Sequence, residues 1–236
     1  MQNFRRKLSI TRALFAGIAF VSTAAASVIL PGGTVAVSGT TFASRPELGG
    51  LVLEDTIVNW SADGGATFGT MQTRVVREDV AGTLDFYFRI FNDPQSQKFV
   101  AAGRFENYAG FATDVDYRID GLGTIGPYQV KRVGAGGSSV NFVFDSATPI
   151  AVAPGQESLF LMIKTDAVNY TTSIGDLVIG PDLAGAPSGS ISNLMTVYAP
   201  TSVPEPATYG LLAAGLLCLG VARRRRRPTL REMHCR

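Results

Sequence analysis

Residues 83–91 read Thr-Leu-Asp-Phe-Tyr-Phe-Arg-Ile-Phe, and their alternation sets the fold class of the chain. Large apolar side chains recur at every second position, at Leu84, Phe86, Phe88 and Ile90. The residues between them are Asp85, Tyr87 and Arg89. Because successive side chains of a strand point to opposite faces, this period of two predicts a β-strand with one face against a hydrophobic core.

The same alternation recurs through the middle of the chain. The further candidate strands are 114–120, 140–144 and 159–164, with weaker ones near 34–42, 51–60, 71–78, 128–133 and 191–198. Turn-forming residues separate these segments, as at Asp63-Gly64-Gly65, and predict a break at Gly180-Pro181 within a loop over 180–190. We therefore predict an all-β domain at 27–198, an antiparallel β-sandwich of about nine or ten strands, with a linker at 199–203.

Charge is distributed unevenly along the 236 residues. The whole chain carries 21 Lys and Arg against 19 Asp and Glu, a net charge of +2. Residues 1–26 hold 4 bases and no acid, and residues 204–236 hold 7 bases and 2 acids, so the middle has a net charge of −7. An acidic domain argues against a nucleic-acid partner, because phosphate binding needs a basic face.

Residues 27–203 contain neither Cys nor His. A disulfide framework and a zinc site built from Cys or His are therefore excluded there. The catalytic units Ser-His-Asp and Cys-His are excluded as well, because the base that activates the nucleophile is missing. We expect a protein that is not an enzyme and that needs no cofactor.

The first 26 residues are typical of an export signal. Four basic residues, Arg5, Arg6, Lys7 and Arg12, precede an apolar run over 13–25. Ala24-Ala25-Ala26 provides the small residues that signal peptidase accepts, so we predict a signal peptide at 1–26 and Ser27 as the first residue of the mature chain.

The C-terminal region has three parts in a fixed order. Pro204, Glu205 and Pro206 are followed by the uncharged, Ala- and Leu-rich stretch 207–222. Five consecutive arginines come next, at Arg223, Arg224, Arg225, Arg226 and Arg227. A helix over 207–222 is about 24 Å long, short of the ~30 Å hydrocarbon core, and snorkelling arginine stems offset part of the difference. We predict a transmembrane helix at 207–222, a stop-transfer role for the arginines and a basic cytoplasmic tail at 228–236.

This order of parts resembles the PEP-CTERM protein-sorting signal of Gram-negative bacteria that make exopolysaccharide. The resemblance is limited to the C-terminal signal at 204–227, and the tail from Pro228 to Arg236 is longer than the usual pattern. It implies that exosortase, a membrane enzyme of transpeptidase type, recognises Pro204, Glu205 and Pro206. The expected localisation is an inner-membrane-anchored precursor, then the cell surface or extracellular matrix. The implied partners are signal peptidase, exosortase, the inner membrane and, as a candidate ligand, exopolysaccharide.

Two kinds of candidate site remain inside the β domain. Asp114, Asp116 and Asp120 are either a solvated strand face neutralised by Arg118 or, as the alternative, a cation site, although their spacing does not fit an EF-hand loop. Four aromatic residues are either core or platforms for sugar rings: Trp60, Tyr108, Tyr117 and Tyr128.

Three functions follow from these features. The preferred one is an exported surface or matrix protein of structural or interaction type. The alternatives are a carbohydrate-binding module or adhesin, and a polysaccharide hydrolase that uses two carboxylates across a cleft.

Overall fold

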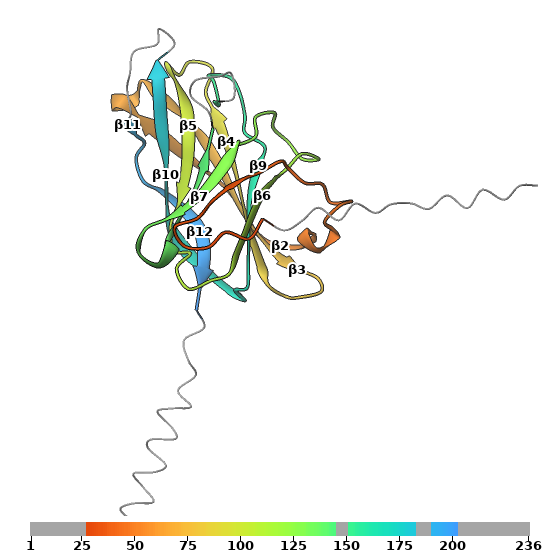
Figure 1. The fold of residues 1–236 in the computed structure, drawn as a ribbon. Coiled ribbons are helices and arrows are strands. Elements are labelled where there is room, and N and C mark those ends of the chain that lie inside the picture. Colours follow the sequence, from red (N-terminus) through yellow and green to blue (C-terminus); the bar gives the residue numbers. More distant parts are fainter. Residues whose placement is uncertain (1–26, 145–150, 183–189, 203–236) are drawn as a thin grey trace, which may run out of the picture.

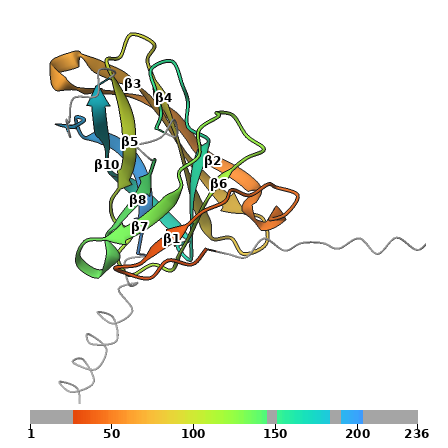
Figure 2. The ribbon, with the colours of Figure 1, turned by 45° about the horizontal axis from the view of Figure 1, so that its top comes forward.

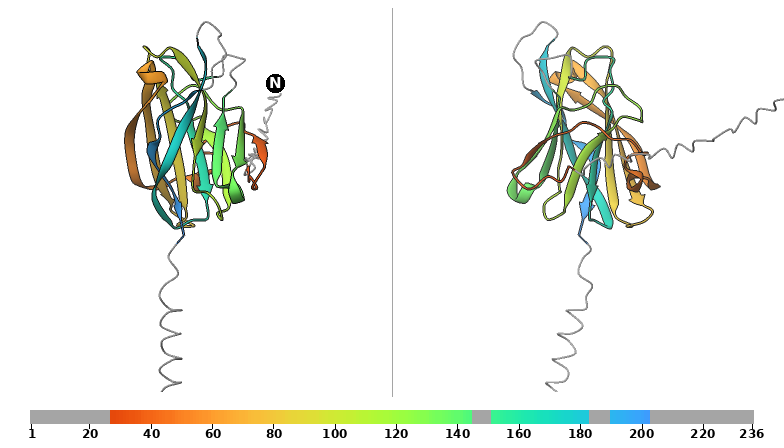
Figure 3. Two further views of the ribbon diagram at one scale, coloured as in Figure 1. Left: turned by 90° about the vertical axis from the view of Figure 1, so that its left-hand side faces the viewer. Right: turned by 45° about the vertical axis from the view of Figure 1, so that its right-hand side comes forward.

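The computed structural model describes residues 27–144, 151–182 and 190–202, which form two antiparallel β-sheets packed face to face (Figure 1, Figure 3). Sheet A has the strand order β2-β3-β4-β9-β6, with bounds Gly50–Ala62, Thr67–Glu78, Leu84–Asn92, Phe160–Thr165 and Thr113–Arg118. Sheet B has the order β1-β7-β8-β5-β10-β11, with bounds Thr34–Ala36, Gln129–Val133, Ser139–Val143, Lys98–Phe105, Asn169–Asp182 and Ser190–Ile191. A further strand, β12 (Met195–Thr201), also pairs with β10. The short 3-10 helices are η1 (Pro46–Leu48), η2 (Asp63–Gly65) and η3 (Ala135–Gly137).

The stretch 83–91 forms the middle strand of sheet A, as predicted. Leu84, Phe86, Phe88 and Ile90 of β4 are all 0% exposed and face sheet B. Phe88 stacks on Phe105 of β5, with ring centroids 3.7 Å apart. The inner faces of the two sheets therefore share one aromatic core, and the predicted all-β antiparallel class is confirmed.

The described residues contain twelve strands, so the predicted number of nine or ten is wrong. The sequence reasoning missed β5 and β10, which pair with each other in the centre of sheet B. Val178 pairs with Ala102 and Ile179 with Val100, so Ala101 is an extra residue in β5. Such a bulge reverses which residues point inward. Val100 and Phe105 are five positions apart, which would place them on opposite faces of a regular strand, yet both lie in the core. The period of two is therefore lost in β5.

Gly180-Pro181 does not break the chain, in contrast to the prediction. Both residues lie within β10, where the register shifts between Ile179 and Asp182. An irregularity of this kind tolerates a proline, which has no N–H to donate. The predicted linker is also partly wrong, because Ala199 to Thr201 continue β12 and pair with Asn169 to Thr171 of β10.

The N-terminal segment, defined here as residues 27–49, connects the edges of the two sheets (Figure 2). Val28 bridges to Asp114 of β6 in sheet A. The chain then crosses to sheet B, where β1 pairs with β7, and returns to sheet A at the bridge between Thr40 and Arg118. This path closes the side of the sandwich where β6 and β7 are the neighbouring edges.

The end of this segment covers part of the outer face of sheet A. Leu48 of η1 packs there in a small second cluster with Val76, Tyr87, Phe160 and Met162. Tyr87 is only 5% exposed, although the alternation placed it on the polar side of β4. Sheet A is thus buried on both faces where η1 lies over it.

Three further predictions fall on residues that the structure does not describe. The signal peptide at 1–26, the sorting signal with its transmembrane helix at 207–222, and the tail at 228–236 all lie outside the described ranges. Within those ranges, no helix has the length and apolar character needed to cross a bilayer.

Candidate functional site

The three predicted acids of β6 and the loop after it fasten the N-terminal segment. Asp114 accepts hydrogen bonds from the backbone N of Ser27 at 2.7 Å and from Arg45 Nη2 at 2.5 Å. Asp116 accepts one from the backbone N of Gly39 at 2.9 Å. Asp120 follows the strand and accepts one from the backbone N of Phe42 at 2.6 Å.

This arrangement corrects the interpretation of Asp114 and Asp116 as part of a solvated strand face, whereas Asp120 is exposed and paired with Arg118 as that interpretation expected. Asp114 and Asp116 are only 7% and 5% exposed, because residues 27–45 cover them. Asp120 forms a two-point ion pair with Arg118, which lowers the pKa of its carboxyl group. Over the described residues, no three carboxylates, imidazoles or thiols converge in a way that could hold a metal ion. The cation alternative therefore gains no support from the geometry.

The aromatic candidates separate clearly by burial. Trp60 is 2% exposed and Tyr108 is 0% exposed, so both belong to the core and neither offers a platform to a ligand. Trp60 donates through Nε1 to the carbonyl of Thr70. Tyr128 is exposed, and Tyr117 is half-buried against the core.

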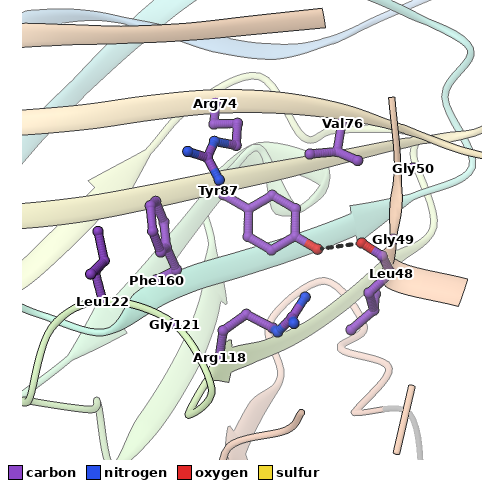
Figure 4. Close-up of a pocket in the computed structure, with 10 residues that line it drawn as sticks. All are labelled: Leu48, Gly49, Gly50, Arg74, Val76, Tyr87, Arg118, Gly121, Leu122 and Phe160. Carbon is purple, nitrogen blue, oxygen red and sulfur yellow. Dashed lines mark hydrogen bonds between the residues drawn. The ribbon is translucent and has the colours of Figure 1, made fainter. Parts of the chain in front are cut away.

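A pocket on the outer face of sheet A is the best-formed candidate site (Figure 4). Its volume is about 310 Å³, and it lies between η1 and the loop after β6. Tyr87 and Phe160 form its floor, and Arg74 and Arg118 lie on opposite sides of the Tyr87 ring. Leu122 adds an apolar side chain to the wall. The Tyr87 hydroxyl donates to the carbonyl of Leu48 at 3.0 Å, which fixes η1 at one end.

The guanidinium groups of this pocket are already neutralised. Arg74 Nη2 lies 2.7 Å from Asp55, and Arg118 Nε lies 2.8 Å from Asp120. Arg74 also lies over the Phe160 ring, with its Cζ 5.0 Å from the ring centroid. The pocket lining therefore presents guanidinium donors next to apolar and aromatic surface, and the charge of these donors is balanced by the adjacent carboxylates of Asp55 and Asp120.

A buried acid lies next to the floor of the pocket, two residues from Tyr87. Asp85 is 0% exposed, and neither of its carboxylate oxygens has a hydrogen-bond partner in the structure. Burial raises the pKa of Asp85 to about 8, with Arg45 opposing and Asp114 adding to that rise. Burial, followed by the nearby Asp85 carboxylate, also raises the pKa of the Tyr87 hydroxyl. The alternation in 83–91 placed Asp85 on a polar face, and no local pattern indicated that this side chain is buried.

Comparison with known proteins adds one finding. The family model for the PEP-CTERM protein-sorting motif matches residues 202–227. No curated protein and no solved structure matches the chain. The matched range begins one residue after β12 ends at Thr201 and contains Pro204 and Arg227. The chain therefore carries the PEP-CTERM sorting signal predicted from its sequence, which implies an exported protein sorted through exosortase.

Proposed function

We propose that the chain is an exported protein of structural or interaction type that reaches the cell surface or extracellular matrix. Signal peptidase removes residues 1–26, and the stretch 207–222 with Arg223 to Arg227 holds the precursor in the inner membrane. Exosortase then acts at Pro204, Glu205 and Pro206 and releases the β domain from its anchor. The match of the sorting motif at 202–227 is the observation that carries this proposal.

The position of the signal relative to the fold supports this order of events. β12 pairs with β10 from Met195 to Thr201, and Pro204 follows only three residues later. A cut within the signal therefore leaves every described strand in place. Prolines on both sides of Glu205 disfavour helix and ladder pairing, so the triplet stays readable by an enzyme at the membrane surface.

Cell fractionation tests the proposal. A chain tagged within the β domain should be recovered from the envelope and the medium without residues 207–236, and protease added to whole cells should digest the domain. Recovery of the intact chain in the cytoplasm, protected from protease, would refute it. A matched chain that lacks residues 1–26 should stay inside the cell and serves as the control.

A second candidate function is carbohydrate binding, and the pocket on sheet A favours it. A sugar hydroxyl can accept hydrogen bonds from the guanidinium groups of Arg74 and Arg118, whose charges are balanced by Asp55 and Asp120 next to the pocket. Leu122 and the aromatic floor suit the apolar face of a sugar ring. Because the arginines are already paired, a neutral saccharide fits this pocket better than an anion.

A panel of neutral and acidic oligosaccharides tests the second function. Neutral oligosaccharides should bind, and Arg118→Ala should weaken binding at least tenfold, which corresponds to about 1.4 kcal/mol. Arg104→Ala is the matched control, because Arg104 pairs with Asp176 on the opposite sheet. Equal affinity in both variants, or binding of acidic saccharides alone, would contradict the assignment.

We propose no reaction for this pocket. A hydrolase would need two acids facing each other across a cleft. Among the described residues that line the pocket, none is Asp or Glu, and the adjacent Asp55 and Asp120 are held by arginines. The hydrolase alternative would regain support if the purified chain cleaved an oligosaccharide and Asp120→Asn abolished that activity.

A further inference from the structure

Ser27, the predicted first residue of the mature chain, is fixed against a buried acid. Its backbone N lies 2.7 Å from Asp114 Oδ1, across 87 positions of sequence. Its carbonyl accepts a hydrogen bond from the backbone N of Val115 at 3.1 Å. Two residues later, Ile29 donates to the carbonyl of Thr113 at 3.0 Å and is only 1% exposed. Residues 27–29 thus run antiparallel to β6, and the nitrogen of Ser27 has a defined position.

The surroundings of Asp114 hold more acid than base. Its second oxygen accepts from Arg45, and Lys164 lies opposite it in the register of β9. Lys164 also forms an ion pair with Glu78 of β3, and Arg45 forms one with Glu47 of η1. Asp116 on β6 and Asp85 on β4 also interact electrostatically with Asp114. Five carboxyl groups, Asp114 included, therefore accompany two bases here. The two carboxyl oxygens of Asp85 have no hydrogen-bond partner, and its raised pKa keeps that group protonated at neutral pH, so the other four acids carry the negative charge.

We infer that signal-peptide removal completes this cluster by placing a new positive charge on the Ser27 nitrogen. Hydrolysis of the peptide bond between Ala26 and Ser27 adds the hydroxyl of water to the carbonyl carbon of Ala26 and a proton to the nitrogen. The free amine takes a second proton from solvent at neutral pH, because an ordinary α-amino group has a pKa of about 7.7–8.0. The neutral amide that donates to Asp114 thereby becomes an ammonium group in a partly buried ion pair. The inference rests on the cleavage site in the proposed function.

The N-terminal segment of the mature chain is therefore bound to β6 more strongly than that of the precursor, and the folded domain is more stable. A hydrogen bond between two charged groups is stronger than one that involves a neutral amide. It also acts at the first residue of the N-terminal segment, which joins the edges of sheets A and B. Export therefore changes the domain itself, because only a processed chain has the ammonium group that Asp114 is placed to receive.

The experiment compares two chains that both extend to Arg236. One begins at Ser27 and the other retains Ala26, which moves the ammonium group one residue away from Asp114. The Ser27 chain should have the higher Tm, by about 3 °C or more. Its amino group should have a raised pKa and react with an acylating reagent at neutral pH at least fivefold more slowly than the amino group of the Ala26 chain. The opposite charge of Asp114 is the cause of that shift.

Asp114→Asn in the Ser27 chain should restore the ordinary reaction rate of the amine. Asp120→Asn is the matched control, because Asp120 holds the backbone N of Phe42 and has no bond to Ser27. It should leave the amine rate unchanged. Equal rates in the parent chain and Asp114→Asn would overturn the inference. If Asp114→Asn does not fold, the comparison of the Ser27 and Ala26 chains decides alone, and equal Tm values with equal rates overturn it.

N-terminal sequencing of the exported protein separates this inference from the proposed function. A first residue other than Ser27 shows that the assigned cleavage site is wrong, and the ion pair with it. Ser27 as the first residue, together with an amine of ordinary reactivity, leaves export intact and refutes only the ion pair.

Discussion

Arg132 of β7 donates through Nη1 to the carbonyl of Ile29 at 3.1 Å, which ties the N-terminal segment to sheet B. The same guanidinium group donates to four more acceptors, namely Gly137 O, Thr113 Oγ1, Tyr108 O and Phe111 O. All five acceptors are neutral, and Arg132 is only 3% exposed. Burial lowers the pKa of its guanidinium group. The buried guanidinium group of Arg132 therefore donates hydrogen bonds to four backbone carbonyls and one hydroxyl, on the side of the sandwich that the N-terminal segment closes.

Arg132→Lys should destabilise the domain by about 2–4 kcal/mol, since a compact ammonium group cannot reproduce the planar five-donor fork and leaves buried carbonyls without partners. Urea-induced unfolding, monitored by tryptophan fluorescence, measures the decrease in the free energy of unfolding. Trp60 is the single tryptophan and is 2% exposed, so its emission reports the unfolding of the core. Arg104→Lys, at a partly exposed ion pair with Asp176, should cost less than about 1 kcal/mol. Equal losses in both variants would contradict the role given to Arg132.

Asp85 should make the stability of the domain fall as pH rises. Its pKa is about 8 in the folded protein, against ~3.9 in an unfolded chain, so the folded state keeps a proton that the unfolded state releases. The stability that this proton contributes is fully present below about pH 4 and is lost as pH rises towards about 8. Each pKa unit corresponds to about 1.4 kcal/mol, so the change across this window amounts to several kcal/mol.

Asp85→Asn should flatten that dependence, because an amide stays neutral at every pH in the window. The variant should match the parent near pH 4 and exceed its stability near pH 8. Urea midpoints measured from pH 4 to pH 9 provide the comparison. Asp79→Asn, at an exposed position, should follow the parent curve. A parent whose stability rises steadily from pH 5 to pH 8, with Asp85→Asn parallel to it, would show that Asp85 is ionised in the folded state.

The regular strands could be predicted from the sequence, whereas the bulge in β5 and the burial of the acids of β6 depend on residues far away in the sequence and could not. β4 was found because Leu84 to Ile90 keep a strict period of two, whereas the extra residue Ala101 in β5 removes that period. The acids of β6 looked solvated for a different reason. The groups that cover Asp114 come from Ser27 and Arg45, which lie 87 and 69 residues away in the sequence. No local pattern encodes such a contact. The sorting signal, in contrast, is local and was recognised in full.

Gly39 holds the backbone turn that brings its own N–H to Asp116. Its φ is +82°, and a Cβ added there would clash with Cγ2 of Ile119 and lie 2.6 Å from Cε2 of the Tyr117 ring. Gly39→Ala should therefore cost about 2–3 kcal/mol, from left-handed strain together with a steric clash. Gly82→Ala is a matched control, since its φ is +70° and an added Cβ would meet nothing within 4 Å. It should cost about 1 kcal/mol, and the difference between the two measures the clash. Equal losses of stability in the two variants would mean that the side chains of Ile119 and Tyr117 move aside at no cost.

Replacing Pro204, Glu205 and Pro206 by Ala should trap the precursor in the membrane. Without the two prolines the triplet can join the helix predicted at 207–222, and without Glu205 its charge is lost, so we expect exosortase to recognise it less well. The arginines at 223–227 are unchanged, and the stop-transfer step should proceed as before. Mass spectrometry of the envelope fraction should find the tail still attached to the β domain, with little domain in the medium.

The control replaces Pro228, Thr229 and Leu230 by Ala, three adjacent residues just beyond the matched range 202–227. This variant should be processed like the parent, because it changes neither the triplet nor the arginines. Release of the first variant as efficiently as the parent would remove the sorting role from the triplet. Retention of both variants would instead assign processing to the length or sequence of the tail. The two triple-alanine variants together therefore distinguish a signal that is recognised at Pro204 to Pro206 from one that is recognised in the predicted cytoplasmic tail.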